Sequence, residues 1–116
     1  MVLVPDRMAV MKGTLDVLVL KALAWAPMHG FEVASWLESR SAGGLELDDS
    51  GLYQALYRLE GKRLISAEWG MTENNRRARY YRLTAAGRAH LRRETATWLR
   101  YASTVTDILT GAQPAS

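Results

Sequence analysis

The chain has 116 residues, of which 48% are hydrophobic and 23% charged, the size and composition of one ordinary globular domain. It contains no cysteine, which excludes disulfides, thiolate catalysis and cysteine-ligated zinc. The most apolar stretch, residues 15–25, is too short to cross a membrane and holds two charged residues, so we expect a cytoplasmic protein with no membrane partner.

Positive charge is concentrated in one part of the chain. The net charge is +3, but residues 58–93 hold ten lysines and arginines against three acids, a balance of +7 that leaves −4 for the rest. This asymmetry predicts a cationic face for a polyanion on a mildly acidic body. A solvated basic surface explains the charge equally well, so charge alone leaves both interpretations open.

Hydrophobic spacing predicts three short helices in the first half of the chain. Apolar residues recur at helical spacing over 15–23, with Thr14 placed to cap this helix and Pro27 to end it. A second helix is expected over residues 31–40, after a turn at Met28-His29-Gly30. A short extended piece and several N-cap acceptors precede a third helix over residues 51–60, with Gly61 as its stop.

The third helix has a polar face opposite its buried stripe. Leu52, Leu56 and Leu59 stand at i, i+4 and i+7 and define the buried side. The other side and its flank carry two tyrosines, a hydroxyl, an amide and a guanidinium, from Ser50, Tyr53, Gln54, Tyr57 and Arg58. Packing alone does not explain this set, which predicts a surface that forms hydrogen bonds to a ligand.

A β-hairpin with a basic loop follows the third helix. Strands are expected over residues 65–69 and 78–83, joined by a long loop over 70–77. The loop and its flanks carry the candidate phosphate and minor-groove contacts Asn74, Asn75, Arg76, Arg77 and Arg79, with Arg82 nearby. A solvated loop is the alternative. Trp25, Trp36 and Trp69 are expected in the core or at its edge.

The last helix is expected to begin after the N-cap Thr84 and to end near residue 109. It carries a narrow apolar stripe of Leu91, Thr95, Trp98, Ala102, Val105 and Leu109. The short helices cannot cover so long a stripe, so a second copy of the chain is the expected partner in a two-fold homodimer. Trp98 lies in the middle of this interface, where packing or effector binding explains it.

The elements together predict a mainly α (α+β) fold, a winged helix-turn-helix with a two-stranded wing and a long C-terminal dimerisation helix. Residues 1–84 would form the DNA-binding domain with an N-terminal extension, and residues 85–116 the dimerisation helix and a frayed tail from Gly111.

No catalytic or metal site is predicted. His29 and His90 stand alone, without a metal-binding spacing, a phosphate loop or a nucleophile elbow nearby. Asp48-Asp49 precedes a helix, where a cap is the commoner role of such residues. We therefore expect a protein that is not an enzyme and that needs no cofactor.

Three segments carry a family resemblance. Residues 11–16 (MKGTLD) with 27–31 (PMHGF), 50–60 (SGLYQALYRLE) and 74–88 (NNRRARYYRLTAAGR) resemble the PadR family of transcriptional regulators, in its short branch with a single C-terminal helix. The resemblance implies a homodimeric repressor on a palindromic operator in double-stranded DNA. It also implies release in some members by a phenolic or hydrophobic compound, and Trp98 resembles a residue that sandwiches flat drugs.

The resemblance assigns base reading to the exposed residues of the third helix and phosphate contact to the wing. Gln54 departs from the proline that many members have there, and glutamine can pair with adenine through two hydrogen bonds. Two other functions remain open, a winged-helix module that docks an acidic protein and a small-molecule sensor with weak DNA contact.

Overall fold

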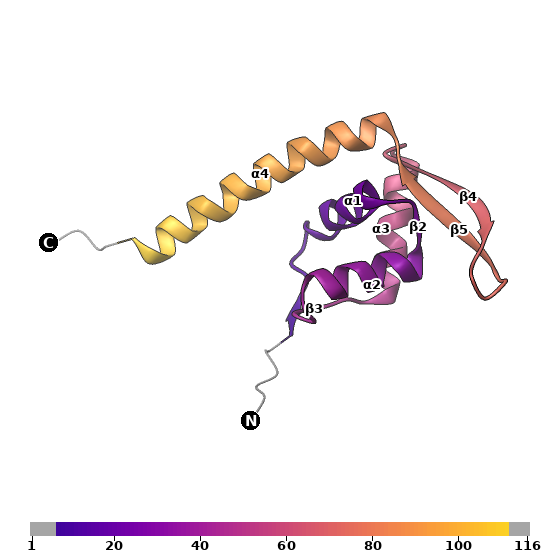
Figure 1. The fold of residues 1–116 in the computed structure, drawn as a ribbon. Coiled ribbons are helices and arrows are strands. Elements are labelled where there is room, and N and C mark those ends of the chain that lie inside the picture. Colours follow the sequence, from indigo (N-terminus) through magenta and orange to yellow (C-terminus); the bar gives the residue numbers. More distant parts are fainter. Residues whose placement is uncertain (1–6, 112–116) are drawn as a thin grey trace, which may run out of the picture.

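The computed structural model describes residues 7–111 (Figure 1). The elements in chain order are β1 (Met8–Ala9), α1 (Leu15–Trp25), β2 (Met28–His29), α2 (Gly30–Arg40), β3 (Leu45–Glu46), α3 (Asp49–Gly61), β4 (Ile65–Met71), β5 (Arg77–Leu83) and α4 (Ala85–Thr110). They confirm the predicted winged helix with a long C-terminal helix. Of the tail expected to fray, only Gly111 lies within the described residues.

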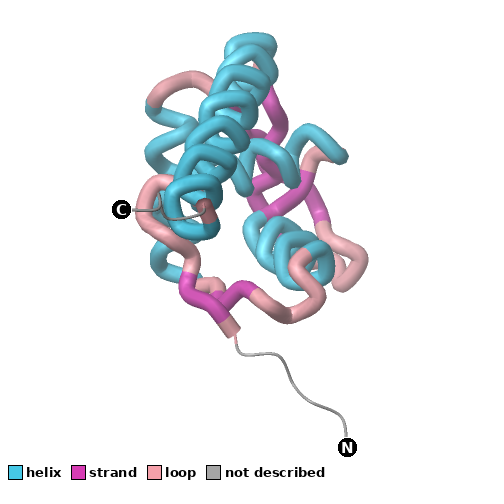
Figure 2. Tube along the Cα trace, turned by 90° about the vertical axis from the view of Figure 1, so that its left-hand side faces the viewer, coloured by secondary structure: helices cyan, strands magenta, loops and turns pink. Residues whose placement is uncertain are grey.

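The shape is elongated because α4 extends beyond the body. The molecule measures 66 × 43 × 21 Å, and α4 starts above the hairpin, crosses α1 and projects past it (Figures 1 and 2). A helix of 26 residues is about 39 Å long. Of the three short helices it is α1 that packs against α4, over the first part of its length.

The core lies where α1, α2 and α3 pack against the hairpin. Its largest fully buried side chains are Leu20, Leu52, Leu56, Leu59, Ile65, Val19 and Val33. The leucine stripe of α3 is therefore buried, as its spacing predicts. No polar or charged side chain is buried among the residues that the structure describes. The core thus depends on apolar packing rather than on internal ion pairs.

Two small sheets connect distant parts of the chain. In the three-stranded sheet, β5 lies between β4 and β2, and Met28 pairs with Tyr81. The expected turn before α2 is thus a short strand that ties α2 to the hairpin. In the second sheet, β1 runs parallel to β3, with Met8 opposite Leu45. The extended piece predicted before α3 is confirmed as β3, whereas β1 and β2 were not indicated by local sequence, because strands of two residues depend on tertiary contacts.

Three helices begin with side-chain caps. The Asp48 carboxylate accepts the Gly51 N–H at 3.2 Å, and the Thr84 hydroxyl accepts the Gly87 N–H at 3.0 Å, as predicted. At α2, His29 Nδ1 accepts the Glu32 N–H at 3.2 Å while Glu32 Oε1 accepts the His29 N–H at 3.1 Å. This reciprocal pair is a capping box in which histidine replaces the usual serine or threonine.

Two predicted helix ends are wrong in detail. The Thr14 hydroxyl donates to the Met11 carbonyl at 2.7 Å, so it closes the preceding turn and does not cap α1. Helix α3 ends at Gly61, but this glycine is the last helical residue and not the turn residue that follows the end. The chain turns instead at Lys62 and at Arg63, whose φ of 61° is left-handed.

The hairpin is longer, and its loop shorter, than the sequence predicts. Its strands pair as far as Met71 opposite Arg77, which leaves a five-residue loop over 72–76. The Tyr80 ring covers Gly70, where an added Cβ would lie 2.8 Å from it, and the Tyr80 hydroxyl donates to the Met71 carbonyl at 3.2 Å. These contacts extend the strands beyond the body.

Two of three tryptophans expected in or near the core are exposed. Trp25 is 68% exposed and Trp69 is 61% exposed, whereas Trp36 packs partly buried against the core. Trp69 lies on the part of β4 that passes beyond the body, and Trp25 ends α1 at the surface. The prediction is therefore wrong for Trp25 and Trp69 and confirmed for Trp36, because the core does not extend to the end of α1 or to the outer part of the hairpin.

Candidate nucleic-acid interface

The exposed face of α3 forms one continuous polar surface. It borders a shallow depression that is lined by all five residues expected to read DNA, Ser50, Tyr53, Gln54, Tyr57 and Arg58. Tyr57 is 81% exposed, and Gln54 Nε2 lies 3.4 Å from Ser50 Oγ, a weak hydrogen bond. The leucine side is buried, so this face is what α3 presents to a ligand.

Tyr53 is held against the start of α2. A Cβ added to Gly30 would lie 2.7 Å from the Tyr53 ring, so the glycine makes the space that the ring occupies. The tyrosine is still 52% exposed. Its ring therefore links α3 to the N-terminus of α2 while its edge remains accessible.

Arg58 is fixed by an ion pair with α1. Its Nη2 donates to Asp16 Oδ1 at 2.7 Å. This hydrogen bond, together with the charge of Asp16, raises the pKa of Arg58. About half of the Arg58 side chain remains exposed, so it stays charged beside the α3 surface.

The polar and basic residues predicted to contact DNA from the wing lie in three different environments. Asn74, Asn75 and Arg76 are exposed in the loop, while the Arg77 guanidinium lies 4.7 Å from the centroid of the Trp69 ring. Arg79 instead donates two hydrogen bonds to Glu60 of α3, at 3.0 and 2.9 Å, and this pairing raises the pKa of Arg79.

Acidic partners of the arginines were missed at the level of sequence. Asp16 and Glu60 pair with Arg58 and Arg79, and Glu68 accepts from Arg82 at 3.0 Å. The partners are 42, 19 and 14 residues apart in the chain. No local spacing signals such pairs, because the fold alone brings them together.

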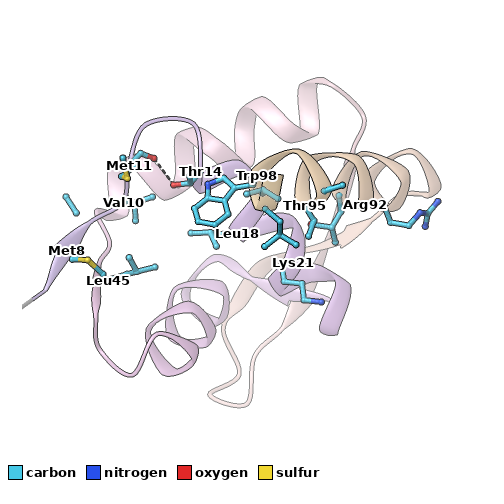
Figure 3. A pocket seen from close by; sticks show the side chains of 15 residues that line it. Met8, Val10, Met11, Thr14, Leu18, Lys21, Leu45, Arg92, Thr95 and Trp98 are labelled. Carbon is cyan, nitrogen blue, oxygen red and sulfur yellow. Dashed lines mark hydrogen bonds between the residues drawn. The ribbon is translucent and has the colours of Figure 1, made fainter. Parts of the chain in front are cut away.

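A second site is an apolar groove between α1, α4 and the N-terminal strand (Figure 3). Its volume is about 870 Å³. Its lining includes Leu91, Thr95 and Trp98, which belong to the apolar stripe predicted on α4, here called the α4 seam. Trp98 of α4 lines the groove together with Thr14 and Leu18, and its indole points toward them in Figure 3. The other seam residues, Ala102, Val105 and Leu109, lie beyond it toward the helix end, where Leu109 is 77% exposed.

The groove includes residues that the sequence did not single out. Met8, Met11 and Leu45 line it from the small β1–β3 sheet and the segment after it. Its charged lining residues are Lys21 and Arg92, both basic. An apolar stretch near the N-terminus was the available signal, but its contact with α4 depends on the pairing of β1 with β3.

Two negative findings concern residues 7–111. No three His, Asp or Glu side chains in this range are grouped closely enough to hold a metal ion. Within the same range no helix is both long enough and apolar enough to span a membrane.

Comparisons with known proteins agree with this geometry. The model of the transcriptional regulator PadR-like family matches residues 19–93. The chain is similar to a PadR family transcriptional regulator from Eggerthella lenta, with 30% identity, 87% of this chain and 86% of that chain covered, and a TM-score of 0.70. It is also similar to a PadR family transcription regulator from Clostridium difficile, with 29% identity, 85% and 100% covered, and a TM-score of 0.70.

A transcriptional regulator from Clostridium thermocellum shares the fold at 23% identity, with 83% and 90% covered and a TM-score of 0.75. The family model alone spans more than half of the chain. A polar α3 face beside a basic wing is what a DNA-binding member of such a family requires. The chain therefore belongs to the PadR-like family of transcriptional regulators, which are DNA-binding regulators rather than enzymes.

Proposed function

We propose that this protein is a homodimeric repressor that binds a palindromic operator. The observation that carries the proposal is the surface formed by the five exposed polar residues of α3, which line one depression. A recognition helix places such residues against base edges in the major groove. Repression follows from the resemblance to PadR regulators, since a dimer bound across a promoter excludes other proteins from it.

Base reading and phosphate contact are assigned to different elements. Gln54 and Tyr57 face away from the core and are placed to read bases, while Tyr53 and Arg58 are held by Gly30 and Asp16 at the border of the surface. The wing residues Asn74, Asn75, Arg76, Arg77 and Arg79 would contact phosphates or the flanking minor groove.

The proposed dimer interface is the α4 seam, which a second copy of the chain would cover. Two seam residues are left exposed to water in one copy, Trp98 at 43% and Leu109 at 77%. A two-fold partner helix would cover them and would present two α3 helices to successive major grooves, about 34 Å apart.

The experiment compares a wing variant with an α3 variant on two duplexes. One duplex carries an inverted repeat from the DNA upstream of the coding region, and the other has the same composition in scrambled order. Arg76→Ala should weaken binding to both duplexes. It should also reduce the slope of log K against log salt concentration by about 0.9 per lost phosphate contact. Gln54→Ala should weaken binding to the inverted repeat alone, by about 1–3 kcal/mol per lost bidentate contact.

Lys12→Ala is the matched control for charge, since Lys12 is exposed and precedes α1, outside both surfaces. It should leave both affinities nearly unchanged. Equal effects of Arg76→Ala and Gln54→Ala on both duplexes would refute the division of roles. Absence of a complex at low salt would favour docking of an acidic protein instead.

The apolar groove supports a second function, release by a small effector. Trp98 is 43% exposed on its wall, and the charged groups of the wall, Lys21 and Arg92, are both cationic. A flat phenolic or other aromatic molecule with an anionic group matches both features. In Trp25→Phe, Trp36→Phe, Trp69→Phe protein, such a compound should quench the remaining Trp98 fluorescence. A cationic compound of the same shape should quench it less, and equal or absent quenching would exclude this assignment.

A further inference from the structure

We propose that Trp69 is a positioning residue of the wing, which holds Arg77 ready to contact a DNA phosphate. The inference rests on the proposed DNA-binding function and adds a residue that the sequence placed in the core. The observation behind it is the Arg77 guanidinium stacked over the Trp69 ring, 4.7 Å from its centroid.

The strand register places Trp69 and Arg77 on the face of the hairpin that is turned toward α3. Ala67 is opposite Tyr81, Trp69 opposite Arg79 and Met71 opposite Arg77, and residues directly opposite in an antiparallel pair share a face. Tyr81 on this face is buried in the core, and Arg79 on it reaches Glu60 of α3. Trp69 and Arg77 therefore continue the core face outward, beyond the body and on the recognition-helix side.

The arginines of the hairpin differ in whether a carboxylate pairs with them. Arg79 is paired with Glu60, and Arg82 with Glu68 on the other face. Among the described residues Arg77 has no carboxylate within ion-pair distance, and its neighbour is an aromatic ring instead. A guanidinium stacked on a ring keeps its full charge and its in-plane N–H donors, which a phosphate requires.

The backbone around Trp69 is held by side-chain packing and by hydrogen bonds. On the opposite face the Tyr80 ring fills the space above Gly70, between Trp69 and Met71 in the chain, and its hydroxyl bonds to the Met71 carbonyl. The loop beyond is closed by the Thr72 N–H, which donates to the Arg76 carbonyl at 2.8 Å. The indole is 61% exposed, so its stabilisation of the core is small and a role outside the core explains it better.

Stacking would raise the affinity for DNA because it orders the Arg77 side chain in the free protein, so that the side chain loses less conformational entropy on binding. An exposed cation–π contact corresponds to about a two- to fivefold change in an equilibrium constant. A dimer that uses both wings would show the square of this factor, about five- to thirtyfold. Trp69 itself carries no charge, so its loss removes no ionic contact directly.

The test is a double-mutant cycle of Trp69→Leu and Arg77→Gln, measured as DNA affinity across a salt series. Trp69→Leu should weaken binding about five- to thirtyfold, and Arg77→Gln should reduce the salt slope by about 1.8 for two wings. The double variant should bind no more weakly than Arg77→Gln alone, because Trp69 acts through Arg77. Trp69→Phe, which keeps a ring, should retain most of the affinity.

Arg76→Gln is the matched control, since Arg76 is the neighbouring loop arginine and has no aromatic ring beneath it among the described residues. Its effect should multiply with that of Trp69→Leu. Multiplying effects for Trp69→Leu and Arg77→Gln would overturn the positioning role, as would an unchanged affinity in Trp69→Leu. If Trp69→Leu lowers Tm, the cycle is repeated with Trp69→Met in place of Trp69→Leu, because methionine also removes the ring but leaves a flexible apolar side chain at this exposed position.

Failure of this inference is distinguishable from failure of the proposed function. Wild-type protein that binds no duplex at low salt refutes both. Wild-type protein that binds with a steep salt dependence, while Arg77→Gln binds equally well, refutes only the assignment of Arg77 and Trp69.

Discussion

Gly30 and Gly87 both lack room for a side chain, but their neighbours differ in how far they can move. A Cβ at Gly30 would meet the end of the Tyr53 side chain, which can rotate away. A Cβ at Gly87 would meet the backbone carbonyl of Leu64, which also accepts hydrogen bonds from Thr84. The same substitution therefore has different consequences at the two sites.

Gly87→Ala should lower the free energy of unfolding by about 1–3 kcal/mol, because the added methyl group forces the start of α4 away from Leu64. Urea denaturation measures this. Gly61→Ala is the control, since an added Cβ there meets no neighbour and alanine favours a helix. Equal stability of the two variants would contradict the close packing of α4 on the hairpin.

Gly30→Ala should change stability by less than about 1 kcal/mol and yet weaken DNA binding, because the Tyr53 ring must leave its place beside α2. Thermal unfolding and fluorescence anisotropy with labelled DNA separate the two effects. Tyr53→Phe keeps the ring in place and should bind more tightly than Gly30→Ala. A Gly30→Ala protein that binds normally would exclude Tyr53 from the interface.

Single residues also show what sequence could and could not predict. The exposed face of α3 follows from the leucine period, and the structure places all five predicted residues on it. The ion pairs of Arg58 and Arg79 could not be predicted, since their partners are distant in the chain. Exposure of Trp69 depends on how far the hairpin passes the core, which composition does not reveal.

At the scale of elements, α3 depends on the cap at its start. The Asp48 carboxylate accepts the Gly51 N–H in the turn that carries Ser50. Asp48→Ala should lower the free energy of unfolding by about 1 kcal/mol. Asp49→Ala, which removes a first-turn acid that makes no cap bond in the structure, should have a smaller effect. Denaturant midpoints at constant salt measure both, and an equal loss would argue against the cap.

The elements themselves were predictable to the extent that they are amphipathic. Helices α1 to α4 and the hairpin agree with their apolar periods, whereas β1 and β2 contain two residues each and exist through pairing with β3 and β5. Met8 and Leu45 reach the groove through this pairing. Residues that line the groove could therefore not be assigned before the fold was known.

At the scale of the whole molecule, the α4 seam should determine the oligomeric state. Val105→Glu would place a charge in the proposed interface and should give a monomer in sedimentation experiments. Thr104→Glu introduces the same charge on an exposed position about 100° away from it and should remain a dimer. A Val105→Glu protein that stays dimeric would move the interface elsewhere.

One measurement tests dimerisation and base recognition together, namely the selection of bound duplexes from a random pool followed by sequencing. A dimer with two α3 helices predicts enriched sites with two-fold symmetry and half-sites about 10 base pairs apart. Affinity for these sites should exceed that for random DNA by at least about 10³-fold and fall steeply with salt. Enrichment of a single asymmetric site, or of no sequence at all, would contradict the account.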